Sequence, residues 1–396
     1  MDVSPLLIEN DSTIVVGLMD GLGGYADADG ATELEAASTP HLDALAAEGS
    51  TGLVEIVGPG ITPGSGPGHL ALFGYDPIEF ELGRGALSAA GLGVELRAGD
   101  VAARGNLCTL HADGTIADRR AGRIASDVAA PLVERLQREV SIDGVEVVLR
   151  HEREHRMLVV LRGEGLDARI ADTDPQAVGV EPRAPRALDP AAERTAEVLG
   201  ELDRQIRVIL AEEAAHAVLM RGFDTHTELP GMAERYGVDA AAIAIYPMYR
   251  GIARLLGMTV TDRPGDLDDQ VRQLADNWAS HDYFFVHHKA TDAAGEDGDR
   301  EAKIAAIEAV DAVIPAIRSL DPDVVMVTGD HATPPQLRAH SWHPVPVLMH
   351  GARVGRDGTA RFGESSCAQG MLGLRPMTQM MPLLLAAAGR LAKYGA

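Results

Sequence analysis

Residues 12–24 read STIVVGLMDGLGG, an apolar run that ends in Asp20 and closely spaced glycines. A short, unbroken run of apolar and β-branched residues is typical of a parallel strand that is buried on both faces. Asp20 would therefore follow the carboxyl end of this strand, where open α/β sheets place their binding sites. Taken alone, Asp20 could equally begin a turn before glycine, so its interpretation depends on the rest of the chain.

Two later strands carry metal-ligand side chains at the same position, just past the strand. The segment DYFFVHHKATD ends at Asp292, and DVVMVTGDHATP contains Asp330 and His331 directly after its apolar run. Because parallel strands end at a common edge, we expect these groups to join Asp20 at one rim of the sheet. Carboxylates and imidazoles there suit two divalent metal ions, which can lower the pKa of a serine and bind phosphoryl oxygens.

A candidate nucleophile lies on a glycine-rich segment. Residues 61–77, ITPGSGPGHLALFGYDP, place Ser65 between Pro-Gly and Gly-Pro-Gly, next to the start of an apolar helix. Gly and Pro favour a tight turn, and the free N–H groups of a helix N-terminus favour an anion. An ordinary surface turn is the alternative, but the metal-ligand candidates elsewhere favour a nucleophilic serine. His69 either points into this site or packs within the helix.

The middle of the chain has a different character. From about residue 99, short strands, turns and a helix replace the α/β alternation, which resumes near residue 183. We therefore expect an α/β domain formed by residues 1–98 and 183–396, with helices flanking a mostly parallel sheet. Residues 99–182 would form an inserted, smaller α+β domain.

The cations of this acidic chain are unevenly distributed. Guanidinium groups match the oxygens of phosphate and carboxylate, and the insert has four candidates, Arg104, Arg119, Arg120 and Arg123. A solvated turn in an arginine-rich sequence is the alternative for each. Lysine occurs only three times, and Lys289 lies three residues before Asp292. Its ammonium could stabilise a phosphoryl group or protonate a leaving hydroxyl, unless it is merely a lysine at the rim.

Composition narrows the class of partner. A net charge of −24 argues against nucleic acid or an acidic membrane. Two distant cysteines make no disulfide scaffold, no apolar run reaches the length of a membrane span, and MDVSPLLIEN lacks the basic start of a signal peptide. We expect a cytoplasmic protein with a small-molecule substrate, and the sequence does not indicate an oligomeric state.

Seven motifs together resemble the archaeal-type, cofactor-independent (2,3-bisphosphoglycerate-independent) phosphoglycerate mutases of the alkaline phosphatase superfamily. They are MDGLGG, TPGSGPGHLALFGYDP, RGN, DRRAGR, KATDAAGEDGD, TGDHATP and HSWHPVPV, and the resemblance covers nearly the whole chain. It implies an alkaline-phosphatase-like α/β core with an inserted domain that closes over the site. It also implies interconversion of 3-phosphoglycerate and 2-phosphoglycerate through a phosphoserine on Ser65.

The resemblance further implies a set of site residues. One divalent ion would be held by Asp20, Ser65, Asp330 and His331. The other would be held by Asp292, Glu296 and His340, with manganese, magnesium, cobalt or zinc as the metal. Besides the four arginines of the insert, the residues implied to bind substrate are Asn106 and Arg250.

Two positions depart from the family pattern. Histidine is expected where the chain has Glu296, and lysine where it has Arg250. Glutamate can still ligate, but it shifts preference towards harder ions such as manganese or magnesium. It could instead mark a weakened second site. Two alternatives therefore stay open, namely a related phosphomutase or phosphatase acting on another phospho- or phosphono-acid, and a catalytically impaired relative.

Overall fold

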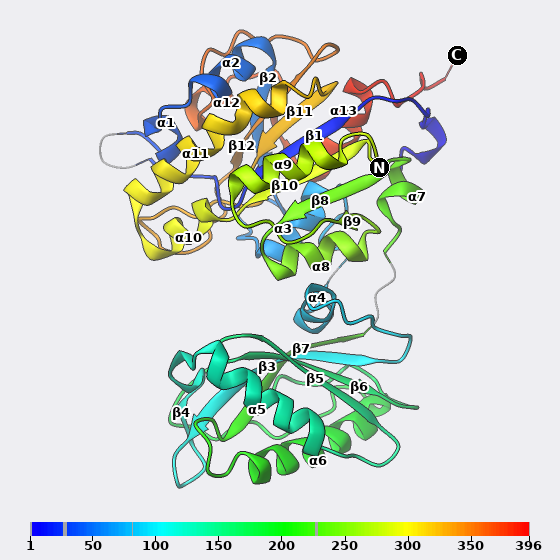
Figure 1. Cartoon of the computed structure of the whole chain (residues 1–396), viewed down its shortest axis with the longest axis vertical. Coiled ribbons are helices and arrows are strands. Elements are labelled where there is room, and N and C mark those ends of the chain that lie inside the picture. Colours follow the sequence, from blue (N-terminus) through cyan, green and yellow to red (C-terminus); the bar gives the residue numbers. More distant parts are fainter. Residues whose placement is uncertain (1, 27–29, 81, 226–228, 396) are drawn as a thin grey trace. The chain divides into compact units, whose positions relative to one another are not determined.

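The computed structural model describes residues 2–26, 30–80, 82–225 and 229–395. The chain folds into two compact units: Met1–Glu81 together with Leu229–Ala396, and the continuous stretch Leu82–Glu228 (Figure 1). An α/β unit interrupted by an inserted α+β unit was expected. The insert is longer at both ends than the expected range 99–182.

The first unit is built on an eight-stranded sheet with the order β13-β2-β12-β11-β1-β10-β8-β9. Strand β12 is antiparallel to both neighbours and every other pair is parallel, which confirms the mostly parallel sheet. Its strands are β1 (Ile14–Met19), β2 (Ser50–Glu55), β8 (Ala240–Ala244), β9 (Thr259–Val260), β10 (Tyr283–His288), β11 (Val324–Thr328), β12 (Val345–Gly351) and β13 (Gly373–Pro376).

Strand β1 has β10 on one side and β11 on the other. The three strands singled out in the sequence are therefore neighbours in the sheet. All three run parallel, so their carboxyl ends lie at one edge. This arrangement positions the site.

Helices cover both faces of this sheet, which explains why its strands are apolar without alternation. Val271 of α9 and Ile314 of α11 line a small apolar space with Val15 and Val325 of the sheet. From the opposite face, Phe73, directly after α3, contacts Phe285 edge-on. The helices of this unit are α1 (Glu33–Ala36), α2 (Pro40–Glu48), α3 (Ser65–Leu72), α7 (Met232–Tyr236), α8 (Pro247–Leu255), α9 (Leu267–Asn277), α10 (Ala290–Asp297), α11 (Arg300–Arg318), α12 (Glu364–Cys367) and α13 (Met380–Ala387), with 3-10 turns η1 (Ser4–Leu6) and η4 (Met377–Gln379).

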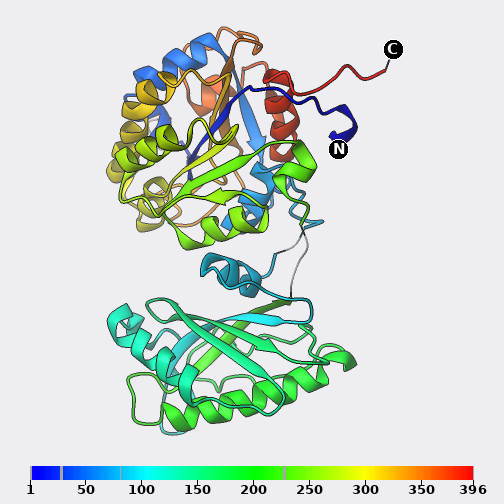
Figure 2. The same ribbon diagram turned by 45° about the vertical axis from the view of Figure 1, so that its right-hand side comes forward.

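The second unit is an antiparallel sheet in the order β4-β3-β6-β5, with β7 also paired to β3. Figure 2 shows α5 and α6 on one side of this sheet and α4 on the other. Leu136 of α5 and Leu199 of α6 share a core with Leu107 and Met157 of the strands. The elements are α4 (Arg84–Gly91), β3 (Val101–Leu110), β4 (Ile116–Asp118), η2 (Ala121–Arg123), α5 (Ser126–Glu139), β5 (Glu146–Arg153), β6 (Arg156–Arg162), η3 (Pro190–Ala192), α6 (Glu193–Ile209) and β7 (Ala217–Thr225).

The expected boundaries of the insert were wrong because two flanking segments complete its sheet. Helix α4 packs so closely that a Cβ on Gly85 would lie 2.2 Å from the carbonyl oxygen of Ala102. At the other end, β7 pairs with β3 along nearly its whole length. A long amphipathic helix followed by a buried strand, α6 and β7, has the same pattern in either unit, so the sequence did not distinguish them.

Among the described residues, no helix is long and apolar enough to cross a membrane.

Candidate functional site

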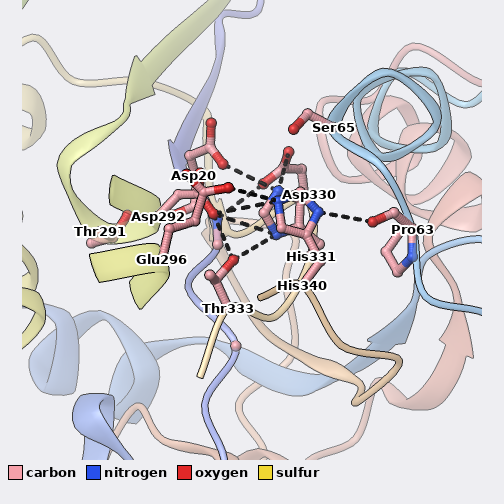
Figure 3. Close-up of polar contacts among 12 residues, drawn as sticks. Asp20, Pro63, Ser65, Thr291, Asp292, Glu296, Asp330, His331, Thr333 and His340 are labelled. Carbon is pink, nitrogen blue, oxygen red and sulfur yellow. Dashed lines mark hydrogen bonds and ion pairs between the residues drawn. The ribbon is translucent and has the colours of Figure 1, made fainter. Parts of the chain in front are cut away.

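The carboxyl ends of β1, β10 and β11 bring the expected acidic and imidazole groups together. Asp20 follows β1 directly, Asp292 lies in the first turn of α10 after β10, and Asp330 and His331 follow β11. The residues form two groups, and within each group the potential ligand atoms all lie within 4.8 Å of one another. The groups are Asp20–Asp330–His331 and Asp292–His331–His340 (Figure 3). His331 is common to both. We call these residues the carboxylate rim.

Buried atoms with lone pairs converge in the first group. The His331 Nε2 atom lies 3.3 Å from Asp20 Oδ1 and 3.4 Å from Asp330 Oδ2. Within the described part of the chain, none of these three atoms has a hydrogen-bond partner, and all are buried. Unpaired buried polar atoms are costly unless a cation completes the set. Two carboxylates and an imidazole are ligands that divalent metals accept, so these residues fit a metal ion.

Hydrogen bonds orient both imidazoles for ligation. The Nδ1 atom of His340 lies 2.9 Å from the carbonyl oxygen of Pro63, which can only accept, so the proton is on Nδ1. The Thr333 hydroxyl donates to Asp292 Oδ1 at 2.6 Å and can therefore accept from His331 Nδ1 at 3.0 Å. In its neutral form, each ring thus presents the lone pair of Nε2 to the carboxylates, as metal-binding histidines do. The rings of His331 and His340 stack with centroids 3.7 Å apart.

Glu296 lies at the outer edge of the second group. Its Oε1 atom is 3.9 Å from His340 Nε2, and its side chain is 56% exposed. His340 Nε2 is 3.7 Å from Asp292 Oδ1, which is buried. Figure 3 shows Glu296 beside Asp292 on α10. The glutamate is therefore within reach of the group, but more open to water than the other carboxylates.

Ser65 is the first residue of α3, directly after Gly64. A Cβ on Gly68, one turn later, would lie 2.5 Å from the carbonyl oxygen of Asp330, so only glycine lets the start of this helix approach the rim. Figure 3 shows Ser65 on the side of Asp330 and His331. Ser65 thus lies at the N-terminus of a helix whose first turn approaches Asp330 of the rim.

His69 was expected either to point into the site or to pack within the helix, and the structure shows elements of both. The ring is fully buried and stacks on Tyr249 with centroids 4.2 Å apart, so it packs within the fold. Its Nδ1 atom also lies 2.8 Å from the Ser65 carbonyl oxygen and 3.2 Å from Asp330 Oδ2. The buried ring therefore contacts both Ser65 and Asp330 and helps to hold them in place.

Lys289 lies between two carboxylates of the rim. Its Nζ atom is 3.1 Å from Asp20 Oδ2, forms an ion pair with Asp292, and donates to the Tyr249 hydroxyl at 3.0 Å. Burial lowers the pKa of this ammonium, but Asp20 and Asp292 outweigh burial and raise the pKa above its ordinary value. The lysine is therefore held as a fixed positive charge.

Sequence reasoning missed two residues at the rim. Tyr249 is fully buried, and its hydroxyl accepts a hydrogen bond from the Lys289 ammonium at 3.0 Å. Burial, with the nearby Asp20 and Asp330 carboxylates, raises the pKa of this hydroxyl. His287, the fifth residue of β10, lies with Nε2 3.0 Å from Asp20 Oδ2. The pair of histidines at the end of an otherwise apolar strand was the available signal for His287. The aromatic YPMY segment gave no such signal for Tyr249.

Arg250 has contacts that differ from the expected ones. Its guanidinium donates to the carbonyl oxygens of Ala244 at 3.0 Å and Thr261 at 2.8 Å. These bonds tie the end of β8 to the chain after β9. Anchoring of the main chain therefore accounts for this arginine, and its placement does not support the expected phosphate contact.

In the second unit, arginines line a cavity of about 190 Å³. Four residues expected to bind substrate lie there, and four more were missed because they come from separate elements. We call this the arginine cavity, and its lining is Arg84, Arg104, Asn106, Arg119, Arg120, His155, Arg156 and Arg221. Of the residues described, this lining does not include Arg123, which lies in η2 with a φ of 56°.

Charge in the arginine cavity is strongly positive. Arg119 is held by two hydrogen bonds to Asp174, at 2.9 and 2.5 Å. Burial lowers the pKa of His155 to about 4, and the neighbouring Arg156 and Arg120 act in the same direction. The histidine is therefore neutral near pH 7. A cavity of this kind suits a small ligand with several negative oxygens.

The sequence and the fold of this chain are similar to those of known proteins. Residues 46–215 match the family model of 2,3-bisphosphoglycerate-independent phosphoglycerate mutase. Proteins named as probable members of that family are 47% identical over the full length of both chains in Thermus thermophilus, and 47% identical over all of this chain and 98% of theirs in Deinococcus radiodurans. The solved cofactor-independent phosphoglycerate mutase of Thermoplasma acidophilum is 31% identical, with a TM-score of 0.75 over 96% of this chain and all of its own. A solved protein of Pyrococcus horikoshii is 27% identical, with a TM-score of 0.83 over 98% of this chain and all of its own.

Proposed function

Because this chain belongs to the family of 2,3-bisphosphoglycerate-independent phosphoglycerate mutases, we propose that it interconverts 3-phosphoglycerate and 2-phosphoglycerate through a phosphoserine on Ser65. The observation that carries the proposal is the position of this serine at the start of α3, next to buried carboxylates and imidazoles with unpaired lone pairs. Such a site suits phosphoryl transfer, in which charge develops on the oxygens in flight.

Two divalent metal ions complete the site in this proposal. Asp20, Ser65, Asp330 and His331 would hold one ion, and Asp292, Glu296 and His340 the other. When bound, such ions supply a lowered pKa for the serine hydroxyl and positive charge for the phosphoryl oxygens. The oriented imidazoles and the buried, unpaired oxygens of the carboxylate rim support this assignment.

The reaction then consists of two transfers. The Ser65 oxygen attacks phosphorus in line, the phosphorus–oxygen bond to glycerate breaks, and the leaving oxygen of glycerate takes up a proton. Glycerate turns within the site, and its other hydroxyl attacks the phosphoserine, returns a proton and frees Ser65. Retention of glycerate between the two steps separates a mutase from a phosphatase.

Lys289 stabilises charge in this scheme. Its raised pKa keeps the ammonium protonated, which suits attraction of phosphoryl oxygens more than donation of a proton. The Tyr249 hydroxyl accepts a hydrogen bond from this ammonium and so helps to hold the lysine at the rim. The arginine cavity would hold the carboxylate of glycerate and keep the molecule from leaving.

The test couples conversion of 3-phosphoglycerate to enolase, without bisphosphoglycerate, after chelation and return of single metals. Released phosphate and a Ser65→Ala variant are followed in parallel, with Ser319→Ala on the surface as the matched control. We expect metal-dependent 2-phosphoglycerate, lost in Ser65→Ala by at least about 10³-fold. Release of inorganic phosphate alone would favour a phosphatase, and no reaction with any metal would favour an impaired relative.

A further inference from the structure

Lys303 of α11 is a buried cation that the proposed reaction does not use. Its side chain is fully buried, although an ammonium is costly to remove from water. Burial lowers its pKa to about 8, an effect that nearby Glu33 opposes. A buried cation of this kind requires partners, and those of Lys303 are specific.

The ammonium joins two loops of the carboxylate rim. It donates to the carbonyl oxygen of Gly23 at 3.1 Å and to that of Thr333 at 2.9 Å. The Glu33 carboxylate, also fully buried, lies 3.8 Å away and balances its charge. Gly23 comes three residues after Asp20, and Thr333 two residues after His331.

These loops are paired with each other where Lys303 meets them. The amide of Gly23 donates to the carbonyl oxygen of His331 at 3.3 Å, and the amide of Thr333 to that of Gly23 at 3.1 Å. The Thr333 hydroxyl bonds Asp292, which belongs to the second ligand group, and His331, which belongs to both groups. A displacement of the Thr333 loop would therefore disturb both groups together.

We propose that Lys303 is a positioning residue that clamps the Gly23 and Thr333 loops and thereby sets the geometry of both metal groups. It touches neither substrate nor metal and acts through Thr333. Without the ammonium, the buried carbonyl oxygen of Thr333 loses its donor and that of Gly23 keeps only the Thr333 amide, so the loops separate or admit water. The inference rests on the metal groups of the proposed function, but its readout is metal affinity and not mutase activity.

The experiment measures Mn²⁺ affinity by calorimetry on the chelator-treated, full-length protein. Lys303→Met keeps much of the length of the side chain and removes its charge. Because partners of metal ligands typically change affinity by about 10–100-fold, we expect Mn²⁺ to bind at least about tenfold more weakly. Thermal melting of each variant records whether it is folded.

Arg390→Met is the matched control. Arg390 is a second buried cation of the same unit, and it bonds the carbonyl oxygen of Ser12 and the carboxylate of Asp282. Those residues precede β1 and β10, so Arg390 serves the amino ends of the strands whose carboxyl ends form the rim. We expect a lower melting temperature and a Mn²⁺ affinity within about twofold of wild type.

The outcomes are distinguishable. Wild-type affinity in folded Lys303→Met, or an equal loss in Arg390→Met, would overturn the inference alone. Absence of Mn²⁺ binding by the wild type would contradict the metal centre of the proposed function, and the inference with it. If Lys303→Met does not fold, Thr333→Val decides, since it keeps the main-chain carbonyl and removes only the hydroxyl. We then expect a loss of about tenfold, and unchanged affinity would overturn the clamp.

Discussion

Two histidines show how differently charge is arranged in the two units. At the carboxylate rim, burial lowers the pKa of His331, but Asp330 and Asp20 outweigh burial and raise it to about 9. In the arginine cavity, burial and the neighbouring Arg156 and Arg120 all lower the pKa of His155, to about 4. The carboxylates of the rim thus favour an added positive charge, either a proton on His331 or a metal ion in its place. The arginines of the cavity favour an added negative charge. A metal-assisted phosphoryl transfer on an acidic substrate requires both.

Removing negative charge from the rim should have the largest effect on this difference between the two units. Asp330→Asn replaces a buried oxygen that has no hydrogen-bond partner among the residues described. Because a divalent ion would lose a charged ligand, we expect mutase activity to fall by about 10³-fold or more, with Mn²⁺ binding weakened. Coupled assay and calorimetry measure the two effects. Exposed Asp262→Asn is the control, and near-normal Mn²⁺ binding by Asp330→Asn would show that the rim does not hold the metal.

Removing charge from the arginine cavity sharpens the contrast, because it leaves the rim unchanged. In Arg156→Met we expect the KM for 3-phosphoglycerate to rise by about tenfold or more, as for loss of a charged hydrogen bond, with Mn²⁺ affinity unchanged. Steady-state kinetics and calorimetry test this. The surface variant Arg138→Met should match the wild type. A KM that stays constant in Arg156→Met would place substrate binding elsewhere.

Placing histidine, the residue expected from the family resemblance, at position 296 should have a moderate effect. Glu296→His replaces a hard carboxylate oxygen by an imidazole, which zinc and cobalt accept more readily than magnesium does. We expect the ratio of activities with cobalt and magnesium to rise by about tenfold. Parallel assays with single metals measure that ratio. Identical metal profiles for the two proteins would mean that residue 296 ligates no ion.

The smallest effect concerns the neutral histidine of the cavity. The pKa of His155 falls from 6.5 to about 4 on folding, so between these values the unfolded chain binds a proton that the folded chain does not. Stability should therefore decrease as pH falls from 6.5 to about 4, and His155→Gln should lessen that decrease. Denaturant titrations at several pH values measure the slope, with exposed His111→Gln of the same unit as the reference. An unchanged slope in His155→Gln would contradict the pKa shift.

The rim could be predicted to the level of single residues, and the arginine cavity only in part. A parallel sheet places the residues after each strand at a common edge, so Asp20, Asp292 and Asp330 could be grouped from strand patterns alone. Antiparallel strands offer no such rule, because neighbouring positions depend on register. Arg156 lies opposite Asn106 on the adjacent strand, and Arg221 opposite Arg104, which no motif indicates. The same limit hid Lys303, whose role depends on carbonyl oxygens that carry no sequence signal.

The order of the strands also has a consequence for synthesis of the chain. The second unit is one continuous stretch, Leu82–Glu228, so all of its strands and helices have been translated before the last third of the protein is made. Strand β1 instead pairs with β10 and β11, which are translated nearly 270 and 310 residues later. The inserted unit is thus able to fold during translation. Asp20, in contrast, gains its neighbours at the rim only after β10 and β11 have been translated. Premature termination anywhere between the end of the insert and Asp330 would leave the complete inserted unit, with its arginine cavity, but without the carboxylate rim.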